Sequence, residues 1–145
     1  MSGRKPELVS ALLAFGGQET GDLNALDGLI TEAVSQPPGH DLDRALFSIF
    51  ERFPEEDGHG VYWSIIHGLE RRGGYEESLL ASVRRSPSPF ALLMLNRLCN
   101  AGQMECAGVR IVPLLEEVAS SSDVAPAARQ EAMEFLEHQR QRANE

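Results

Sequence analysis

The chain has 145 residues, and 42% of them are hydrophobic, which excludes a disordered chain and suits one domain over residues 1–145. Lys and Arg number 13 against 22 Asp and Glu, so the net charge is −9, which argues against nucleic-acid binding through phosphate contacts. This negative charge either favours a basic protein partner or serves solubility alone.

The two cysteines, Cys99 and Cys106, are too few for a disulfide framework or a zinc cage. No apolar run is long enough for a signal peptide or a membrane span. We therefore expect a cytoplasmic protein that binds no membrane.

In the first half of the chain, apolar residues recur at helical spacing and strand-like alternation is nearly absent. The second helix is expected to start after Asp22 and the third at Asp41, because aspartate is a good N-cap. Gly and Pro mark the helix ends. The four helices expected here span about residues 6–15, 23–36, 41–53 and 60–72.

The second half predicts four more helices. Ser88 and Pro89 are typical of an N-cap followed by the first helical residue, and the helix they open is apolar on most sides, as in the centre of a fold. Asp123 is expected to cap the last helix, and the polar segment 139–145 to fray. These helices span about residues 75–85, 89–101, 109–120 and 125–141.

Eight helices joined by short breaks predict an all-α fold of antiparallel pairs. No strict sequence repeat is visible, so we expect a HEAT-like or irregular α-helical array, with a closed helical bundle as the alternative.

Motifs for catalysis or phosphate binding are absent from the sequence. His59 and His67 with Asp57 and Glu70 form either a metal or acid–base set, or a capping turn and a helix-surface pair. We expect the second, and therefore no enzyme activity, no cofactor and no metal.

Residues 61–70 are the most informative stretch. Trp63, His67 and Glu70 fall at i, i+4 and i+7 and form one stripe, offset from the apolar face of the same expected helix. This stripe is either a partner-binding edge, or Trp63 packs in the core and His67 bonds a nearby carbonyl.

Two further groups are candidates for partner binding. The turn with Glu55, Glu56 and Asp57 is either part of an acidic patch or a solvated surface. Asn96, Arg97 and Asn100 are the polar positions of an otherwise apolar helix, where they either contact a partner or tie neighbouring loops together by hydrogen bonds. The partner-binding set is Glu55, Glu56, Asp57, His59, Trp63, His67, Glu70, Asn96 and Arg97.

A Trp/His-bearing helix, a Ser-Pro turn over residues 86–89, and an apolar helix ending in Asn96-Arg97-Leu98 follow one another. The middle of the chain thereby resembles the small all-helical immunity proteins of bacterial polymorphic toxin and contact-dependent inhibition systems. The resemblance implies a cytoplasmic antitoxin that binds a cognate toxin domain, possessing no enzyme activity and no cofactor. The acidic charge is compatible with a basic nuclease toxin. The alternatives are a helical adaptor or scaffold module and a small enzyme using His59 or His67.

Overall fold

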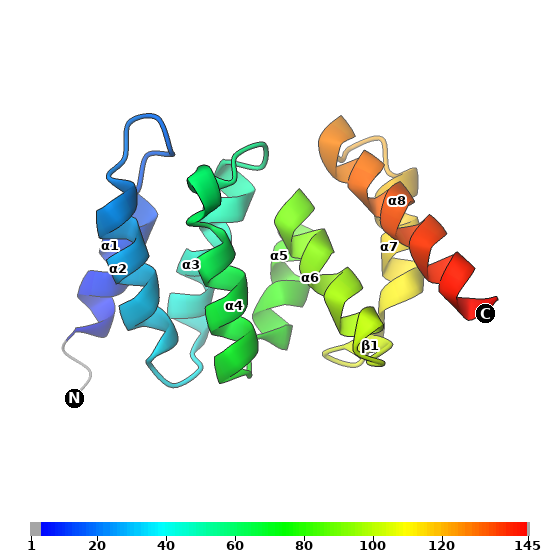
Figure 1. Ribbon diagram of the computed structural model, residues 1–145, viewed down its shortest axis with the longest axis horizontal. Helices are drawn as coiled ribbons and strands as arrows, with labels where there is room; N and C mark the ends of the chain where they lie inside the picture. Colours follow the sequence, from blue (N-terminus) through cyan, green and yellow to red (C-terminus); the bar gives the residue numbers. More distant parts are fainter. Residues whose placement is uncertain (1–3, 145) are drawn as a thin grey trace. The chain divides into compact units, whose positions relative to one another are not determined.

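The computed structural model describes residues 4–144, and these form α-helices with one short hairpin (Figure 1). The helices are α1 (Lys5–Ala14), α2 (Leu23–Val34), α3 (His40–Arg52), α4 (Trp63–Arg72), α5 (Glu76–Arg85), α6 (Pro89–Asn100), α7 (Ile111–Ser120) and α8 (Pro126–Ala143). A 3-10 turn, η1 (Gly58–Gly60), lies between α3 and α4. The predicted all-α class is confirmed. None of the described helices is long and apolar enough to cross a membrane.

The chain divides into two compact units, residues 1–78 and 79–145, and the division falls within α5. We refer to them as the first unit and the second unit and describe each by itself. The expectation of a single domain over the whole chain stays a prediction.

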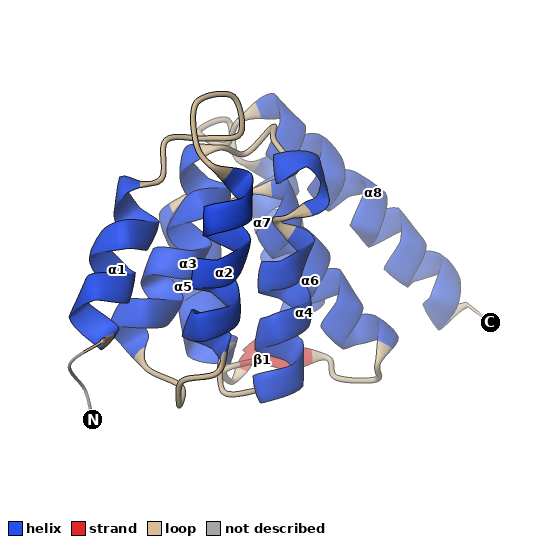
Figure 2. Ribbon diagram, turned by 60° about the vertical axis from the view of Figure 1, so that its left-hand side comes forward, coloured by secondary structure: helices blue, strands red, loops and turns tan. Residues whose placement is uncertain are grey.

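The first unit contains two layers of helices. α1 packs against α3, α2 packs against α4, and α1 also contacts α2. Figure 1 shows α2 and α4 side by side on one face of the unit with α1 and α3 behind them, and in the turned view of Figure 2 α1 and α3 lie to the left of α2 and α4. This arrangement of packed helix pairs is the one that the sequence predicts.

The predicted inward faces of α3 and α4 are buried, because their apolar residues recur every three or four positions. The residues expected on these faces, Tyr62 among them, are at most 1% exposed, except for Val61, which is half-buried; Phe47, which is not among the expected residues, is fully buried as well. Tyr62 contacts the ring of Phe50 from α3 at a centroid distance of 6.5 Å. The buried residues among those expected are Leu42, Ala45, Leu46, Ile49, Phe50, Tyr62, Ile65, Ile66 and Leu69.

Two of the four predicted helix caps are confirmed. The Asp22 side chain accepts from the Ala25 amide at 3.0 Å, and Ser88 accepts from the Ala91 amide at 3.3 Å. The caps predicted at Asp41 and Asp123 are wrong. α3 starts after Gly39, which places Asp41 inside the first turn.

The start of α8 has a different cause. Pro126 is its first residue, with the φ angle of proline already suited to a helix. Its ring keeps the preceding Ala125 out of the helical region, so Ala125 rather than Asp123 occupies the cap position.

In the second unit, α6 and α7 both pack against α8. α8 continues through Ala143, into the segment 139–145 for which fraying stays a prediction. Gln139 is only 6% exposed and donates from Nε2 to Asn96 Oδ1 at 2.6 Å. Arg142 donates to Asn100 Oδ1 at 2.7 Å. These hydrogen bonds hold the end of α8 against α6. The sequence does not predict this contact, because residues 139–143 have no apolar residues at helical spacing. Glu145 lies outside the described residues.

A feature not predicted from the sequence is the hairpin of β1 (Glu105–Cys106) and β2 (Val109–Arg110), which pair antiparallel. The connecting residues Ala107 and Gly108 have φ angles of +50° and +82°. Positive φ at both central residues defines a type I′ turn, for which Asn-Gly is the preferred pair. The Ala-Gly pair found here is a weaker indication of such a turn, so the sequence does not predict the hairpin.

Replacing Ala107 by Asn is expected to stabilise the protein by about 1 kcal/mol, because alanine tolerates the left-handed region poorly and asparagine tolerates it better. Urea unfolding with an unchanged m-value measures the gain. Ala101→Asn is the matched control, since Ala101 is also exposed but has a φ of −86°. An equal gain in both variants would contradict the explanation from turn geometry.

Candidate partner-binding surface

Negative charge is concentrated in the first unit. Residues 1–78 hold 6 Lys and Arg against 14 Asp and Glu, a net −8, whereas residues 79–145 hold 7 against 8, a net −1. The whole-chain charge is therefore a property of one unit. Any electrostatic attraction of a basic partner acts mainly on this unit.

Two loops at the same end of the first unit carry much of that charge. Residues 15–22 join α1 to α2, and residues 53–62 join α3 to α4 (Figure 1). We call them together the acidic loop pair. They contain no Lys or Arg, and their acids are Glu19, Asp22, Glu55, Glu56 and Asp57.

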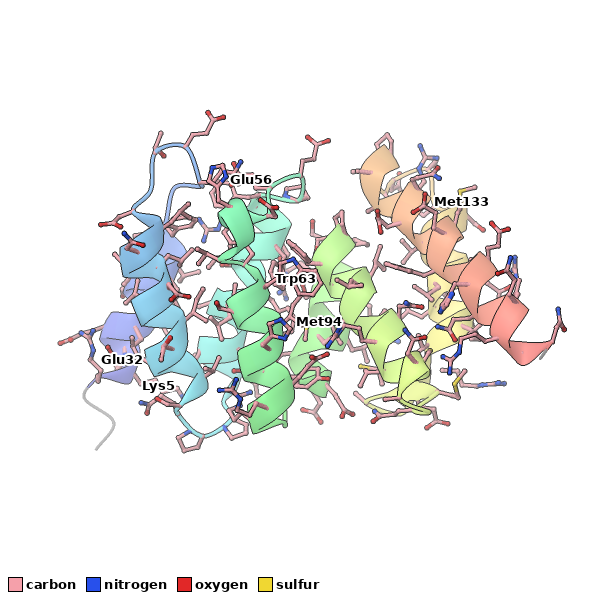
Figure 3. The ribbon with its side chains drawn as sticks, viewed as in Figure 1. Lys5, Glu32, Glu56, Trp63, Met94 and Met133 are labelled. Carbon is pink, nitrogen blue, oxygen red and sulfur yellow. The ribbon has the colours of Figure 1, made fainter. Side chains whose placement is uncertain are left out.

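Hydrogen bonds hold the two loops together. Glu56 Oε1 accepts from the Gln18 amide at 2.9 Å and from the Tyr62 hydroxyl at 2.8 Å. A third hydrogen bond joins the loops in the other direction: the Gln18 side-chain oxygen Oε1 accepts from the Gly58 backbone amide at 2.9 Å. Burial raises the pKa of Tyr62, and the hydrogen bond to Glu56 raises it further, so the phenol stays protonated as the donor. Figure 3 shows Glu56 at the N-terminal end of α4.

The basic residue next to these loops in sequence, Arg52, is exposed but bonded to backbone carbonyl oxygens. Arg52 donates to the carbonyl oxygens of Phe15 at 2.6 Å and Leu12 at 3.0 Å, and its guanidinium lies 5.1 Å from the centre of the Phe53 ring. Burial lowers the pKa of Arg52. Arg52 therefore caps the C-terminal end of α1, and none of the ion pairs shown among the described residues joins it to the loop carboxylates.

The four site residues predicted in this loop differ in their exposure to solvent. Glu55, Asp57 and His59 are exposed, whereas Glu56 is half-buried and bonded internally. His59 has a φ of +51° between two glycines of positive φ, and its amide donates to Asp57 Oδ1 at 2.9 Å. The turn thus keeps Glu55, Asp57 and His59 at the surface, while Glu56 anchors it.

Glu56→Ala is expected to lower the free energy of unfolding by about 1–3 kcal/mol, because the Tyr62 hydroxyl and the Gln18 amide both lose their acceptor. Glu56→Gln keeps an acceptor oxygen and is expected to cost less. Glu55→Ala, the exposed neighbour, is expected to stay within about 0.5 kcal/mol of wild type. Chemical unfolding of the three variants checks this order, and equal losses at positions 55 and 56 would refute the anchoring role.

The stripe on α4 also has a definite geometry. The Trp63 and His67 rings stack, with centroids 5.6 Å apart and planes inclined by 26°. Trp63 and Glu70 are half-buried and His67 is exposed, whereas Tyr62, Ile65, Ile66 and Leu69 are fully buried. Trp63 thus flanks the core, as the offset of the stripe predicts. We call Trp63, His67 and Glu70 the α4 edge; Figure 3 shows Trp63 on α4.

Contacts between α2 and α4 hold the α4 edge in place, and sequence reasoning missed them. Ser64 donates from Oγ to Asp27 Oδ1 at 2.9 Å. A Cβ atom at Gly68 would lie 2.7 Å from the Val34 side chain, so the absence of a side chain lets the two helices approach closely. A glycine inside an amphipathic helix was the one available signal for such close packing.

The remaining predicted residues lie in the second unit, on α6. Asn96 is 6% exposed and accepts from Gln139, which favours the tying role of its two alternatives and leaves little surface for a partner. Arg97 is half-buried in the last turn of the same helix. Whether Arg97 contacts a partner stays a prediction.

Among residues 4–144, no three His, Cys, Asp or Glu side chains gather as metal ligands. Comparisons with models of protein families, with curated proteins and with solved structures found no match to this chain. The case for a function therefore depends on the charge, the shape of the acidic loop pair and the α4 edge.

Proposed function

We propose that this chain is an immunity protein, an antitoxin that binds a cognate bacterial toxin domain in the cytoplasm and blocks its active site or substrate entry. The observation that carries the proposal is the concentration of negative charge in the first unit, beside a half-buried tryptophan. The resemblance of residues 61–70 and 86–98 to helical immunity proteins supports it.

The charge suggests what kind of toxin is bound. A nuclease needs Lys and Arg around its active site to hold phosphates. An acidic surface that carries no cation of its own, such as the acidic loop pair, complements such a site and speeds encounter with it. We therefore propose a basic nuclease-type domain as the partner, held by Glu55, Asp57 and His59 and by the α4 edge.

Inhibition by binding requires no reaction from this chain. The internally bonded Glu56 and the turn around His59 give the loop a fixed shape before it meets a partner. A pre-shaped surface loses less conformational entropy on binding, which favours tight complexes. We propose neither a metal nor a cofactor for this role.

Co-expression tests the proposal. If a large toxin gene lies directly upstream of this chain's gene, its C-terminal domain is expressed alone and with this chain. Growth arrest by the domain alone, relief by the chain, and a purified one-to-one complex without nuclease activity are expected. A complex whose toxin activity is undiminished would instead indicate an adaptor or scaffold. An upstream metabolic operon would remove the basis for an antitoxin.

A further inference from the structure

A groove of about 670 Å³ runs between α7 and α8 in the second unit. Its apolar lining comes from Ala119 on α7 and from Met133 and Leu136 on α8. Met133 is 52% exposed, one of three large hydrophobic side chains of the described residues exposed to this degree. The other two do not line the groove. Figure 3 shows Met133 on α8.

The rim of the groove is acidic. Glu116, Glu134 and Glu137 are exposed lining residues, and Arg140 is the one basic side chain among those lining it. The Arg140 guanidinium lies 3.5 Å from the Glu116 carboxylate, so these two charges compensate each other and Glu134 and Glu137 leave the rim negative. Burial raises the pKa of the Glu131 carboxyl, also on α8, and the nearby charge of Glu134 raises it further.

We propose that this groove is a docking site for a segment of a partner protein in which an apolar side chain is flanked by Lys or Arg. The apolar side chain covers Met133, and the cations reach Glu134 and Glu137. Methionine suits such a role because its flexible side chain adapts to different partners. Helical segments commonly dock in this way, with an apolar stripe in a groove and charges at its rim.

A second copy of this chain is a poorer occupant. In a two-fold interface the same surface meets itself, so the carboxylates of one α8 would face those of the other. Like charges placed together oppose association. The groove lies in the second unit, so this inference does not depend on the proposed function of the acidic loop pair and the α4 edge.

The probe is a synthetic amphipathic peptide with Leu on one face and Lys on the other, and a second peptide in which Ser replaces Leu. Binding to the full chain is followed by fluorescence anisotropy at about 0.15 M salt, where long-range charge effects are screened. We expect the Leu/Lys peptide to bind at least fivefold more tightly than the Ser/Lys peptide. Amide shifts on binding are expected to centre on residues 133–137.

Variants locate the site. Met133→Gln is expected to weaken binding at least fivefold, and Glu134→Lys with Glu137→Lys at least tenfold. Glu105→Lys with Glu117→Lys is the matched control, because it changes the net charge equally at exposed positions that do not line the groove. We expect this control to change the dissociation constant less than twofold. Circular dichroism and thermal unfolding verify that each variant folds. If Met133→Gln does not fold, Met133→Ala takes its place in the binding experiment.

Several outcomes would overturn the proposal. Equal losses in the two double variants would mean that binding follows net charge alone. Wild-type affinity in Met133→Gln, or amide shifts confined to the first unit, would place the peptide elsewhere. A dimer that Met133→Gln dissociates would identify a second copy as the occupant, contrary to the proposal.

Discussion

Asp43→Ala is expected to lower the free energy of unfolding by about 3–5 kcal/mol, the range for breaking a buried ion pair from one side. Asp43 is 1% exposed, and its two carboxylate oxygens accept from the Arg72 guanidinium at 2.8 and 2.6 Å. The Arg72 side chain is itself only 10% exposed. The alanine variant therefore leaves a buried guanidinium without its counter-charge, between the start of α3 and the end of α4.

Two variants test this explanation by urea unfolding. Asp43→Leu combined with Arg72→Met removes both charges and keeps apolar volume, so its stability is expected to lie close to wild type. Asp41→Ala removes an exposed carboxylate from the same turn and is expected to cost less than about 1 kcal/mol. If the paired variant is as unstable as Asp43→Ala, the loss comes from packing rather than from an unpaired charge.

The ion pair also shows what apolar spacing does not reveal. On α3, the positions 42, 45, 46, 49 and 50 identify the buried face from sequence because all are apolar. Asp43 lies three and four residues before Leu46 and Phe47, so it shares their side of the helix. A charge at that position signals a buried partner, but spacing along one helix does not identify Arg72, which is 29 residues away.

The candidate site likewise contains one part that the sequence predicts and one part that it does not. The stripe of Trp63, His67 and Glu70 follows from helical geometry, and the structure places Trp63 and His67 ring against ring. The inward turn of Glu56 does not follow, because its partner Gln18 comes from another loop, 38 residues away. Neighbouring acids in a sequence look alike, and only the tertiary fold separates the anchor from the exposed residues.

The last prediction concerns binding of the cognate toxin domain and distinguishes the roles of the two parts of the site. Trp63→Ala is expected to weaken the complex by about 2 kcal/mol, roughly 30-fold in the dissociation constant, through a faster off-rate. A large aromatic side chain that becomes fully desolvated in the complex must regain water before the partner leaves. Trp63 is the chain's one tryptophan, so in the wild type its fluorescence reports on desolvation at the interface, whereas the variant carries no tryptophan and its dissociation is followed through a label on the toxin domain.

Glu55→Lys with Asp57→Lys is expected to slow association instead, because exposed carboxylates mainly steer the encounter, and added salt is expected to mask the difference. Asp41→Lys, at the far end of the 13-residue α3, is the control and is expected to change the on-rate less. Stopped-flow association and dissociation at low and high salt measure both rates. If Trp63→Ala unfolds the protein, Trp63 supports the fold rather than the interface. If all three variants fold and keep wild-type rates at low salt, the toxin binds elsewhere, because the acidic loop pair and the α4 edge then contribute neither steering nor contact.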